Sequence, residues 1–234
     1  MKNYTSINDI DNINTWIGEA IKIKQNRLKN KELGKNKTLG LLFFNSSLRT
    51  RLSTQKAALN LGMDPIVMNV SGDAWGIEFG DGTIMDGNTA EHIKEAAAVV
   101  SQYCDIVAVR AFPSLTDKEK DESEHVLKSF IEFASVPVVS MESATGHPLQ
   151  GLTDAITIFE NSTKKKPKVV LSWAPHIKAL PHAVANSFVQ AMQKMDVEFV
   201  ITNPEGYNLN SEITKKTTIY HNQEEAFKDA DFIY

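Results

Sequence analysis

The sequence has little of what defines several special classes of protein. It contains one cysteine, Cys104, so no disulfide can form within the chain, and we expect a reducing compartment, the cytoplasm. It has no run of about eighteen apolar residues and begins with polar residues, so we expect neither a membrane partner nor secretion. The net charge of −4 argues against general binding to nucleic acid or to membrane surfaces.

Signatures of metal and cofactor sites are missing as well. The six histidines have no metal-ligand spacing with one another or with the cysteine, so we expect no metal. No Gly-x-Gly-x-x-Gly, Walker loop, nucleophile elbow or zinc motif occurs, which leaves dinucleotide, ATP-loop and covalent serine chemistry without support. We therefore expect a function without a cofactor, carried by an ordinary globular chain of 234 residues, 42% of them hydrophobic.

Apolar runs that alternate with helical patterns predict an α/β fold with parallel sheets. We expect strands at residues 39–44, 65–70, 106–109, 136–141, 168–173, 198–202 and 231–234. We expect helices at residues 12–28, 50–61, 91–103, 122–134, 182–195 and 224–228, and another that begins at 152–159. Because the pattern restarts near Lys168, we expect two domains. The glycine-containing stretch 71–89 is a long loop of the kind that is usually functional or disordered.

The last residues, 230–234, form part of a predicted strand. In open α/β sheets the loops that build sites follow the carboxyl ends of strands, and here that loop is absent. Since chains rarely end on a buried strand without a covering element, we expect a fragment.

The stretch 43–54 carries the clearest functional signal. The apolar run 39–44 predicts a buried strand that breaks at the turn-forming residues 45–47, and a helical pattern follows through Leu61. A strand that ends in such a turn at a helix start offers free backbone N–H groups and the positive end of the helix dipole. These features predict an anion site.

Side chains at the same place support that prediction. Arg49, Thr50 and Arg51 add guanidinium groups and a hydroxyl, which suit phosphate or carboxylate better than a lone lysine does. The alternative is a capped helix whose arginines are solvated.

Further polar residues follow other predicted strands, namely Arg110, Glu142, His147, Gln150 and His176. Because the carboxyl ends of parallel strands share one edge, we expect these groups and the 47–50 turn to converge on one crevice. Arg110 could instead be a surface arginine, and His147 a loop histidine with a local backbone partner.

The motifs Ser47-Leu48-Arg49-Thr50, followed by Arg51, and His147-Pro148-Leu149-Gln150, with Arg110 between them, resemble the carbamoyltransferase family. In that family Ser-x-Arg-Thr-Arg and His-Pro-x-Gln bind carbamoyl phosphate. The resemblance covers the whole chain and points to the branch that acts on N-acylated ornithine, with the best match to its succinylornithine members. The matching segments are Asp73-Ala-Trp75-Gly-Ile-Glu78-Phe, Met85-Asp86-Gly87, Glu91-His92, Val109-Arg110-Ala-Phe-Pro113 and Trp173-Ala-Pro175-His176.

The resemblance implies two doubly wound parallel-sheet domains of the carbamoyltransferase type. Residues 1–148 would bind carbamoyl phosphate, and residues 149–234 would form an acylornithine domain, incomplete at its end. The activity implied is transfer of the carbamoyl group to the δ-amine of N-succinyl-L-ornithine, giving N-succinyl-L-citrulline and phosphate in arginine biosynthesis. Family members continue past the last residue here to a His-Cys-Leu-Pro segment, so this polypeptide would show little or no turnover.

Roles for single residues are implied by the same resemblance. Carbamoyl phosphate would lie on the turn Ser47–Thr50, which includes Leu48, with Arg49 and Thr50 on the phosphate. Arg110 and His147 would polarise the carbamoyl oxygen, and Gln150 would orient the carbamoyl group. Glu142 and His176 would contact the amino-acid substrate. Trp75 would reach the site of the next subunit in a homotrimer.

Acyl specificity depends on the residue before Glu91-His92. By resemblance, acetyl-type members carry glutamate there and succinyl-type members carry proline, whereas this chain has Ala90. A glutamate would repel the distal carboxylate of a succinyl group and alanine would not, which favours succinyl. N-acetylornithine and ornithine are the alternative substrates.

Two readings from other functional classes stand beside the enzyme. A non-catalytic anion-binding α/β module would be correct if this 234-residue chain were the mature product. A nucleotide-binding regulatory domain would need a phosphate loop longer or richer in glycine than residues 45–47.

Overall fold

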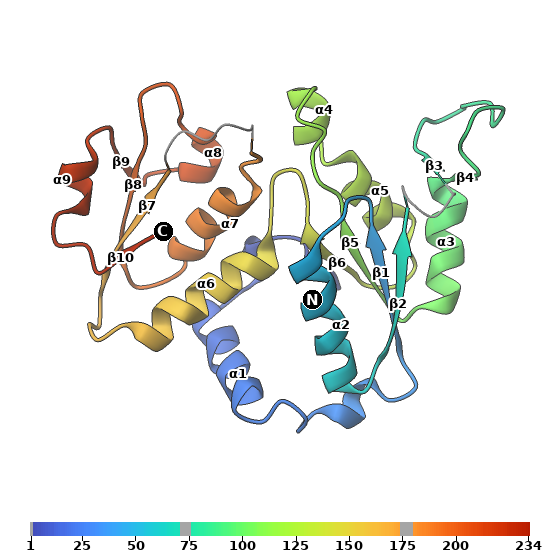
Figure 1. Ribbon diagram of the computed structural model, residues 1–234, viewed down its shortest axis with the longest axis horizontal. Coiled ribbons are helices and arrows are strands. Elements are labelled where there is room, and N and C mark those ends of the chain that lie inside the picture. Colours follow the sequence, from blue (N-terminus) through green and yellow to red (C-terminus); the bar gives the residue numbers. More distant parts are fainter. Residues whose placement is uncertain (1, 71–75, 174–179) are drawn as a thin grey trace. The chain divides into compact units, whose positions relative to one another are not determined.

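The computed structural model describes residues 2–70, 76–173 and 180–234 (Figure 1). The chain divides into two compact units. Unit 1 contains the residues up to Thr5 and Lys22–Ala144, and unit 2 contains Ser6–Ile21 and Thr145–Tyr234. The division lies a few residues before the predicted boundary of 148, and an N-terminal segment belongs to the second unit. Sequence periodicity cannot show this, because the helix α1 (Ile13–Gln25) runs without a break from one unit into the other.

Unit 1 is built on a parallel sheet of four strands. Their order is β2-β1-β5-β6, with β1 at Thr38–Phe43, β2 at Asp64–Asn69, β5 at Ile106–Arg110 and β6 at Val138–Glu142. All four lie where the apolar runs predicted strands. The chain winds from β1 to β2 in one direction and from β5 to β6 in the other, so the switch point lies between β1 and β5. The other elements of this unit are η2 (Lys31–Gly34), α2 (Leu48–Leu61), β3 (Ile77–Glu78), β4 (Glu91–His92), α3 (Ile93–Tyr103), α4 (Lys118–Glu122) and α5 (His125–Phe133).

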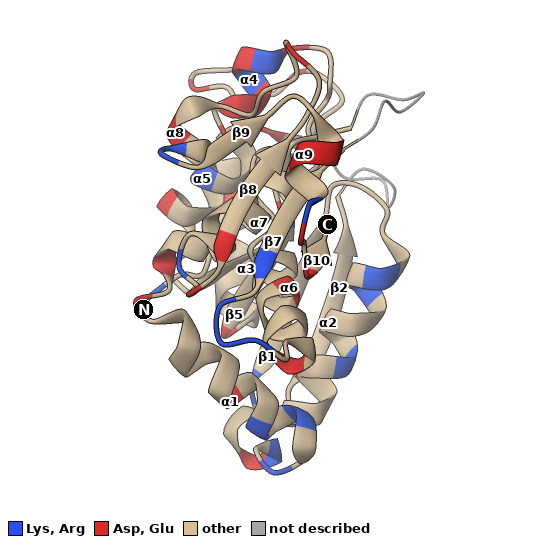
Figure 2. Ribbon diagram, turned by 90° about the vertical axis from the view of Figure 1, so that its left-hand side faces the viewer, with Lys and Arg blue, Asp and Glu red and all other residues tan. Residues whose placement is uncertain are grey.

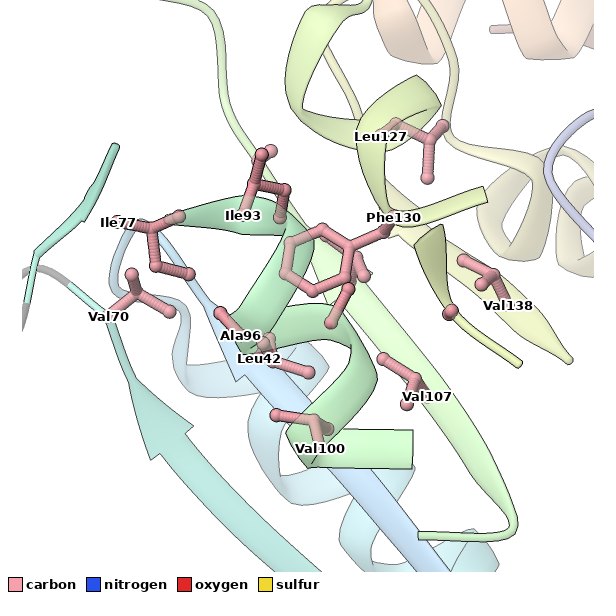
Figure 3. Packing of buried hydrophobic residues seen from close by; sticks show 14 of the residues in the cluster. Leu42, Val70, Ile77, Ile93, Ala96, Val100, Val107, Leu127, Phe130 and Val138 are labelled. Atoms are coloured by element: carbon pink, nitrogen blue, oxygen red, sulfur yellow. The ribbon is translucent and has the colours of Figure 1, made fainter. Parts of the chain in front are cut away.

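Both faces of this sheet are covered, as a doubly wound fold requires. Successive strand residues point to opposite faces. Leu42 belongs to a buried cluster with residues of α3 and α5, among them Val100 and Phe130 (Figure 3). The next residue, Phe43, lies under the guanidinium of Arg51 from α2, whose central carbon is 4.6 Å from the ring centroid. The predicted α/β class with parallel sheets is therefore confirmed.

Helix α2 is closed at both ends by local chemistry. The Ser47 side chain caps its first turn by accepting from the Thr50 N–H, at 3.4 Å between Oγ and N. Gly62 ends it in the left-handed conformation with φ of 82°, and a Cβ there would lie 2.0 Å from the Lys31 carbonyl oxygen. Only glycine therefore fits at this helix end. The helix starts at Leu48, two residues before the predicted start.

Unit 2 contains a second parallel sheet, in the order β10-β7-β8-β9. Its strands are β7 (Lys168–Ser172), β8 (Glu198–Thr202), β9 (Thr218–Tyr220) and β10 (Phe232–Ile233), and its helical segments are η1 (Ile7–Asp9), α6 (Pro148–Asn161), α7 (Ala183–Met192), α8 (Ser211–Thr214) and α9 (Gln223–Phe227). Here the winding direction reverses between β7 and β10. The segment that follows β7 leads into residues 174–179, outside the described part of the chain.

Several predicted boundaries were wrong for identifiable reasons. The predicted helix 91–103 begins at Ile93, because residues 91–92 pair with β3 as strand β4. The predicted helix 122–134 corresponds to α5, which begins three residues later, after Glu124 with its positive φ of 57°, and the preceding helix α4 was not predicted. The helix expected from 152 starts at Pro148, a residue suited to the first position of a helix. The short elements η1, η2, β3, α8 and β9 were not predicted. Among the described helices, none combines the length and the apolar character needed to cross a membrane.

Candidate functional site

The polar residues expected at strand ends in unit 1 do lie at one edge of its sheet. Phe43, the last residue of β1, pairs with Arg110 at the end of β5, and Arg110 pairs with Glu142 at the end of β6. A bulge between Val109 and Arg110 shifts the register at this point. These carboxyl ends flank the switch point, where open α/β sheets bind their ligands.

Arg110 ties this edge together. Its Nε and Nη2 donate to Glu142 Oε2 at 3.1 and 2.8 Å, and its Nη1 donates to the carbonyl oxygens of Asn45 and Ser46, both at 3.2 Å. Arg110 and Glu142 are 8% and 7% exposed. The Asn45 side chain in turn accepts from the Phe112 N–H at 2.7 Å. The turn before α2 is thus held by its carbonyl oxygens, and Arg110 is no surface arginine.

The start of α2 keeps donors for a ligand. The first N–H groups of a helix have no partner within it, and here the Ser47 cap uses one of them, that of Thr50. Arg49 is exposed, and no hydrogen bond or ion pair holds its side chain within the described residues. Arg51 differs: it lies over Phe43 and donates to the Asn69 side chain, so it fastens α2 to the sheet. Backbone N–H groups and Arg49 together suit an anion.

In unit 2 the His-Pro-x-Gln motif begins helix α6. His147 is the N-cap residue of α6, and its N–H donates to the Ser187 hydroxyl of α7 at 2.8 Å. The Asn186 side chain donates to the Thr145 carbonyl oxygen at 3.0 Å. At Gly151 a Cβ would lie 2.7 Å from the Ser187 carbonyl oxygen, so glycine allows α6 and α7 to approach. The backbone of His147 is therefore fixed by α7.

Gln150 and Asp154 lie one turn apart on α6. Gln150 Nε2 donates to Asp154 Oδ1 at 2.7 Å, and the Asp154 side chain is buried, at 8% exposed. Burial raises the pKa of the Asp154 carboxyl, and hydrogen bonds from Gln150 and Tyr234 offset this only in part. Asp154, Asn186 and Ser187 were not among the predicted site residues. The i, i+4 spacing of Gln150 and Asp154 is the one sequence signal that could have indicated the pair.

The raised pKa predicts how stability depends on pH. Because the folded-state pKa of Asp154 exceeds its ordinary value of 3.8, the stability linked to this group is full below 3.8 and is lost as pH rises through the raised value. Asp154→Asn, which stays neutral, should therefore melt at a higher temperature than the wild type at neutral pH. The difference should shrink on acidification toward about pH 4.

Thermal melts across this pH range measure the effect. Glu160→Gln, the same change at an exposed position of α6, is the control and should leave the melting temperature nearly unchanged. An Asp154→Asn variant that is less stable than the wild type at neutral pH would contradict the prediction.

Of three other predicted site positions, the structure describes only one. Trp75 and His176 lie outside the described residues. Ala90 is exposed, and its N–H donates to the Gly76 carbonyl oxygen at 3.1 Å, next to the β3–β4 pair. Proline has no N–H and could not form this bond. Alanine thus anchors the loop through a contact that proline cannot make.

One hollow in unit 2, of about 430 Å³, is not part of this site. It lies at the amino ends of β7 and β8, the edge of the sheet opposite to the ligand-binding one. The lining carries charges of both signs, and Figure 2 shows acidic residues on α9 and a basic residue at the start of β7. The lining residues are Lys164, Lys166, Lys168, Glu198, Tyr220, Glu225, Lys228, Asp229 and Asp231. No group of three or more histidine, cysteine, aspartate or glutamate side chains suited to a metal occurs in the described ranges.

Comparison with known proteins agrees with this geometry. An N-succinylornithine carbamoyltransferase from Bacteroides fragilis (strain 638R) is 50% identical over 234 residues, which are all of this chain and 74% of that protein. An N-acetylornithine carbamoyltransferase from Xanthomonas axonopodis pv. citri (strain 306) is 41% identical over 195 residues, 82% of this chain and 56% of the relative.

A solved structure is similar over the whole chain. It is a variant of N-acetyl-L-ornithine transcarbamylase in which alanine replaces one glutamate, complexed with carbamyl phosphate and N-succinyl-L-norvaline. It superposes with a TM-score of 0.89 at 35% identity and covers all of this chain and 75% of its own. Residues 2–160 match the family described as aspartate/ornithine carbamoyltransferase, carbamoyl-P binding domain, and include both the α2 turn and the start of α6. The turn before α2 and the His-Pro-x-Gln start of α6 are thus features that the chain shares with its relatives. The chain belongs to the aspartate/ornithine carbamoyltransferase family.

Proposed function

We propose that the protein transfers the carbamoyl group of carbamoyl phosphate to the δ-amine of N-succinyl-L-ornithine. The products are N-succinyl-L-citrulline and phosphate. The observation that carries the proposal is the turn before α2, whose carbonyl oxygens are held by Arg110 while N–H groups and Arg49 remain for an anion. The relatives named above support the carbamoyl chemistry. The identity to the succinylornithine enzyme, over the whole chain, favours the succinyl substrate.

The phosphate end of the substrate is assigned to unit 1. Ser47, Leu48, Arg49 and Thr50 would surround the phosphate with backbone N–H groups, a guanidinium and a hydroxyl. Arg110 would act on the carbamoyl oxygen through Nη2, which has one N–H more than its bond to Glu142 uses. Glu142 is assigned to the amino-acid substrate, whose amine would have to share this carboxylate with Arg110.

The carbamoyl end is assigned to the start of α6. The His147 imidazole would donate to the carbamoyl oxygen as negative charge develops there, and Gln150 would orient the carbamoyl amide. The amine lone pair forms the new C–N bond, the bond from the carbonyl carbon to the phosphate oxygen breaks, and the amine loses one proton. Positioning and electrostatic stabilisation supply the catalysis, with no covalent enzyme intermediate.

The remaining assignments concern positions that the structure does not describe, and the assembly. His176 is assigned to the acylornithine, and Trp75 to the site of a neighbouring subunit in a homotrimer. We assign the protein to the cytoplasm, where this biosynthetic step would take place.

The substrate choice is tested by replacing Ala90. With the protein expressed from its full reading frame, we expect activity on N-succinylornithine and little on N-acetylornithine or ornithine. Ala90→Glu should raise KM for N-succinylornithine by at least about tenfold, because two carboxylates would face each other. Ala90→Gln has nearly the same shape without the charge and should have a much smaller effect.

Citrulline-derivative formation from carbamoyl phosphate measures all three substrates in parallel. Activity on N-acetylornithine in place of N-succinylornithine would refute the succinyl assignment and leave the carbamoyl chemistry intact. No activity on any of the three would refute the enzyme and favour an anion-binding module.

A further inference from the structure

Asp154 is an unusual residue for the interior of α6. Its side chain is 8% exposed, and its Oδ2 atom is buried with no hydrogen-bond partner among the described residues. Burial of a carboxylate is unfavourable, and no arginine or lysine of the described chain forms an ion pair with it. A neutral side chain of the same size would pack at lower cost. Packing therefore does not explain why an acidic residue occupies this position.

The neighbours of Asp154 are both hydrogen-bond donors. Gln150 Nε2 donates to Oδ1 at 2.7 Å, and the Tyr234 hydroxyl, the second donor, is near enough to the carboxyl to lower its pKa. The Tyr234 ring is stacked on Phe188, with ring centroids 4.0 Å apart and an angle of 16° between planes. That stack holds the phenol in place, so Asp154 has a fixed neighbour on one side and the Gln150 amide on the other.

An ionised Asp154 carboxylate fixes the orientation of the Gln150 side-chain amide. Ionised aspartate has acceptors only, so it bonds the NH₂ end of the amide and leaves the Oε1 end directed away from it. An asparagine at the same place could bond either end and would not fix the orientation. The acid thus determines whether Gln150 presents an acceptor or a donor to a ligand.

We propose that Asp154 is a positioning residue, which fixes the Gln150 amide so that its Oε1 accepts from the NH₂ group of carbamoyl phosphate. This inference rests on the proposed function. A carbamoyl NH₂ offers donors and needs an acceptor, whereas a reversed Gln150 would place donor against donor. Asp154 thereby acts on the recognition of the carbamoyl group and leaves recognition of the phosphate group to unit 1.

Two simpler phosphates separate this role from a structural one. Acetyl phosphate has a methyl group in place of the NH₂, and inorganic phosphate lacks the acyl group altogether. Binding of all three to the wild-type chain and to Asp154→Asn is measured by calorimetry with freshly dissolved ligands. We expect Asp154→Asn to lose about five- to tenfold in affinity for carbamoyl phosphate and to bind acetyl phosphate and inorganic phosphate as the wild type does.

Further variants make the test independent of one substitution. Gln150→Met should lose the preference for carbamoyl phosphate over acetyl phosphate to a similar extent, and the double variant should lose no more than either single one. Glu160→Gln, an exposed acid-to-amide change on α6, is the matched control and should change no affinity. If Asp154→Asn does not fold, the proposal is still refuted when Gln150→Met prefers carbamoyl phosphate over acetyl phosphate as strongly as the wild type does.

The outcomes distinguish this inference from the proposed function. A wild-type chain with no preference for carbamoyl phosphate over acetyl phosphate would overturn the proposed function itself. A wild-type preference that Asp154→Asn leaves unchanged would overturn only the role of Asp154. If Asp154→Asn loses the same affinity for all three ligands, Asp154 has a structural role, and its role as a positioning residue is overturned too.

Discussion

Replacing Glu142 by alanine is expected to lower the free energy of unfolding by about 3–5 kcal/mol, because it leaves the buried Arg110 guanidinium without its ion-pair partner. Both side chains are less than a tenth exposed. The Arg110 Nε and Nη2 would lose their acceptor, while Nη1 still bonds the carbonyl oxygens of Asn45 and Ser46. The loss should therefore be far larger than for an ion pair at the surface.

Urea unfolding followed by circular dichroism measures this difference. Glu122→Ala is the matched control, since Glu122 pairs with Lys118 at the surface, where the two side chains are 48% and 84% exposed. That substitution should cost less than about 1 kcal/mol. A Glu142→Ala protein as stable as the control would show that the Arg110–Glu142 pair does not stabilise unit 1.

Replacing His147 by alanine is expected to lower kcat by about 100- to 1,000-fold, if the imidazole donates to the developing oxyanion as proposed. KM for carbamoyl phosphate should change much less, because the phosphate contacts assigned to α2 remain. The loop itself should keep its shape. Its anchors are the His147 N–H bond to Ser187 and the Asn186 bond to the Thr145 carbonyl, and neither uses the imidazole.

Steady-state kinetics of the protein expressed from its full reading frame give both constants. His221→Ala removes an exposed histidine that bonds the Asn203 carbonyl oxygen, and it should leave kcat within about twofold of the wild type. A fall in kcat of less than tenfold for His147→Ala would exclude the imidazole as the main oxyanion donor.

Local patterns predicted the strands of the two four-stranded sheets except β9, because buried parallel strands are short apolar runs between polar breaks. The turn at residues 45–47 and the glycine end of α2 were equally visible, since Ser47 and Gly62 have strong positional preferences. Element boundaries were predicted wrongly where a residue suits two kinds of local structure. Pro148 ends many elements but starts α6, and Glu91-His92 can join a helix yet pairs with β3.

The polar residues at the strand ends of unit 1 were predictable from the sequence, but the contacts between them were not. Arg110 was expected to act on a ligand, and its position at the end of β5 agrees with that. Its bonds to the Asn45 and Ser46 carbonyl oxygens depend on the register of three strands and on a bulge. No single segment encodes such a register. Asp154 was missed because an acid on an amphipathic helix is normally read as solvent-facing.

The discontinuous make-up of unit 2 has a consequence for how the chain folds during synthesis. Ser6–Ile21 leaves the ribosome before Lys22–Ala144 of unit 1, yet its own unit continues only from Thr145, and the Ile10 carbonyl oxygen accepts from the Lys194 ammonium at 2.8 Å. Ile7, Ile10, Ile13 and Ile17 are almost fully buried in the finished protein. This isoleucine-rich segment must therefore remain without its final partners while all of unit 1 is made. Such a long wait slows folding and leaves an apolar segment for chaperones to bind.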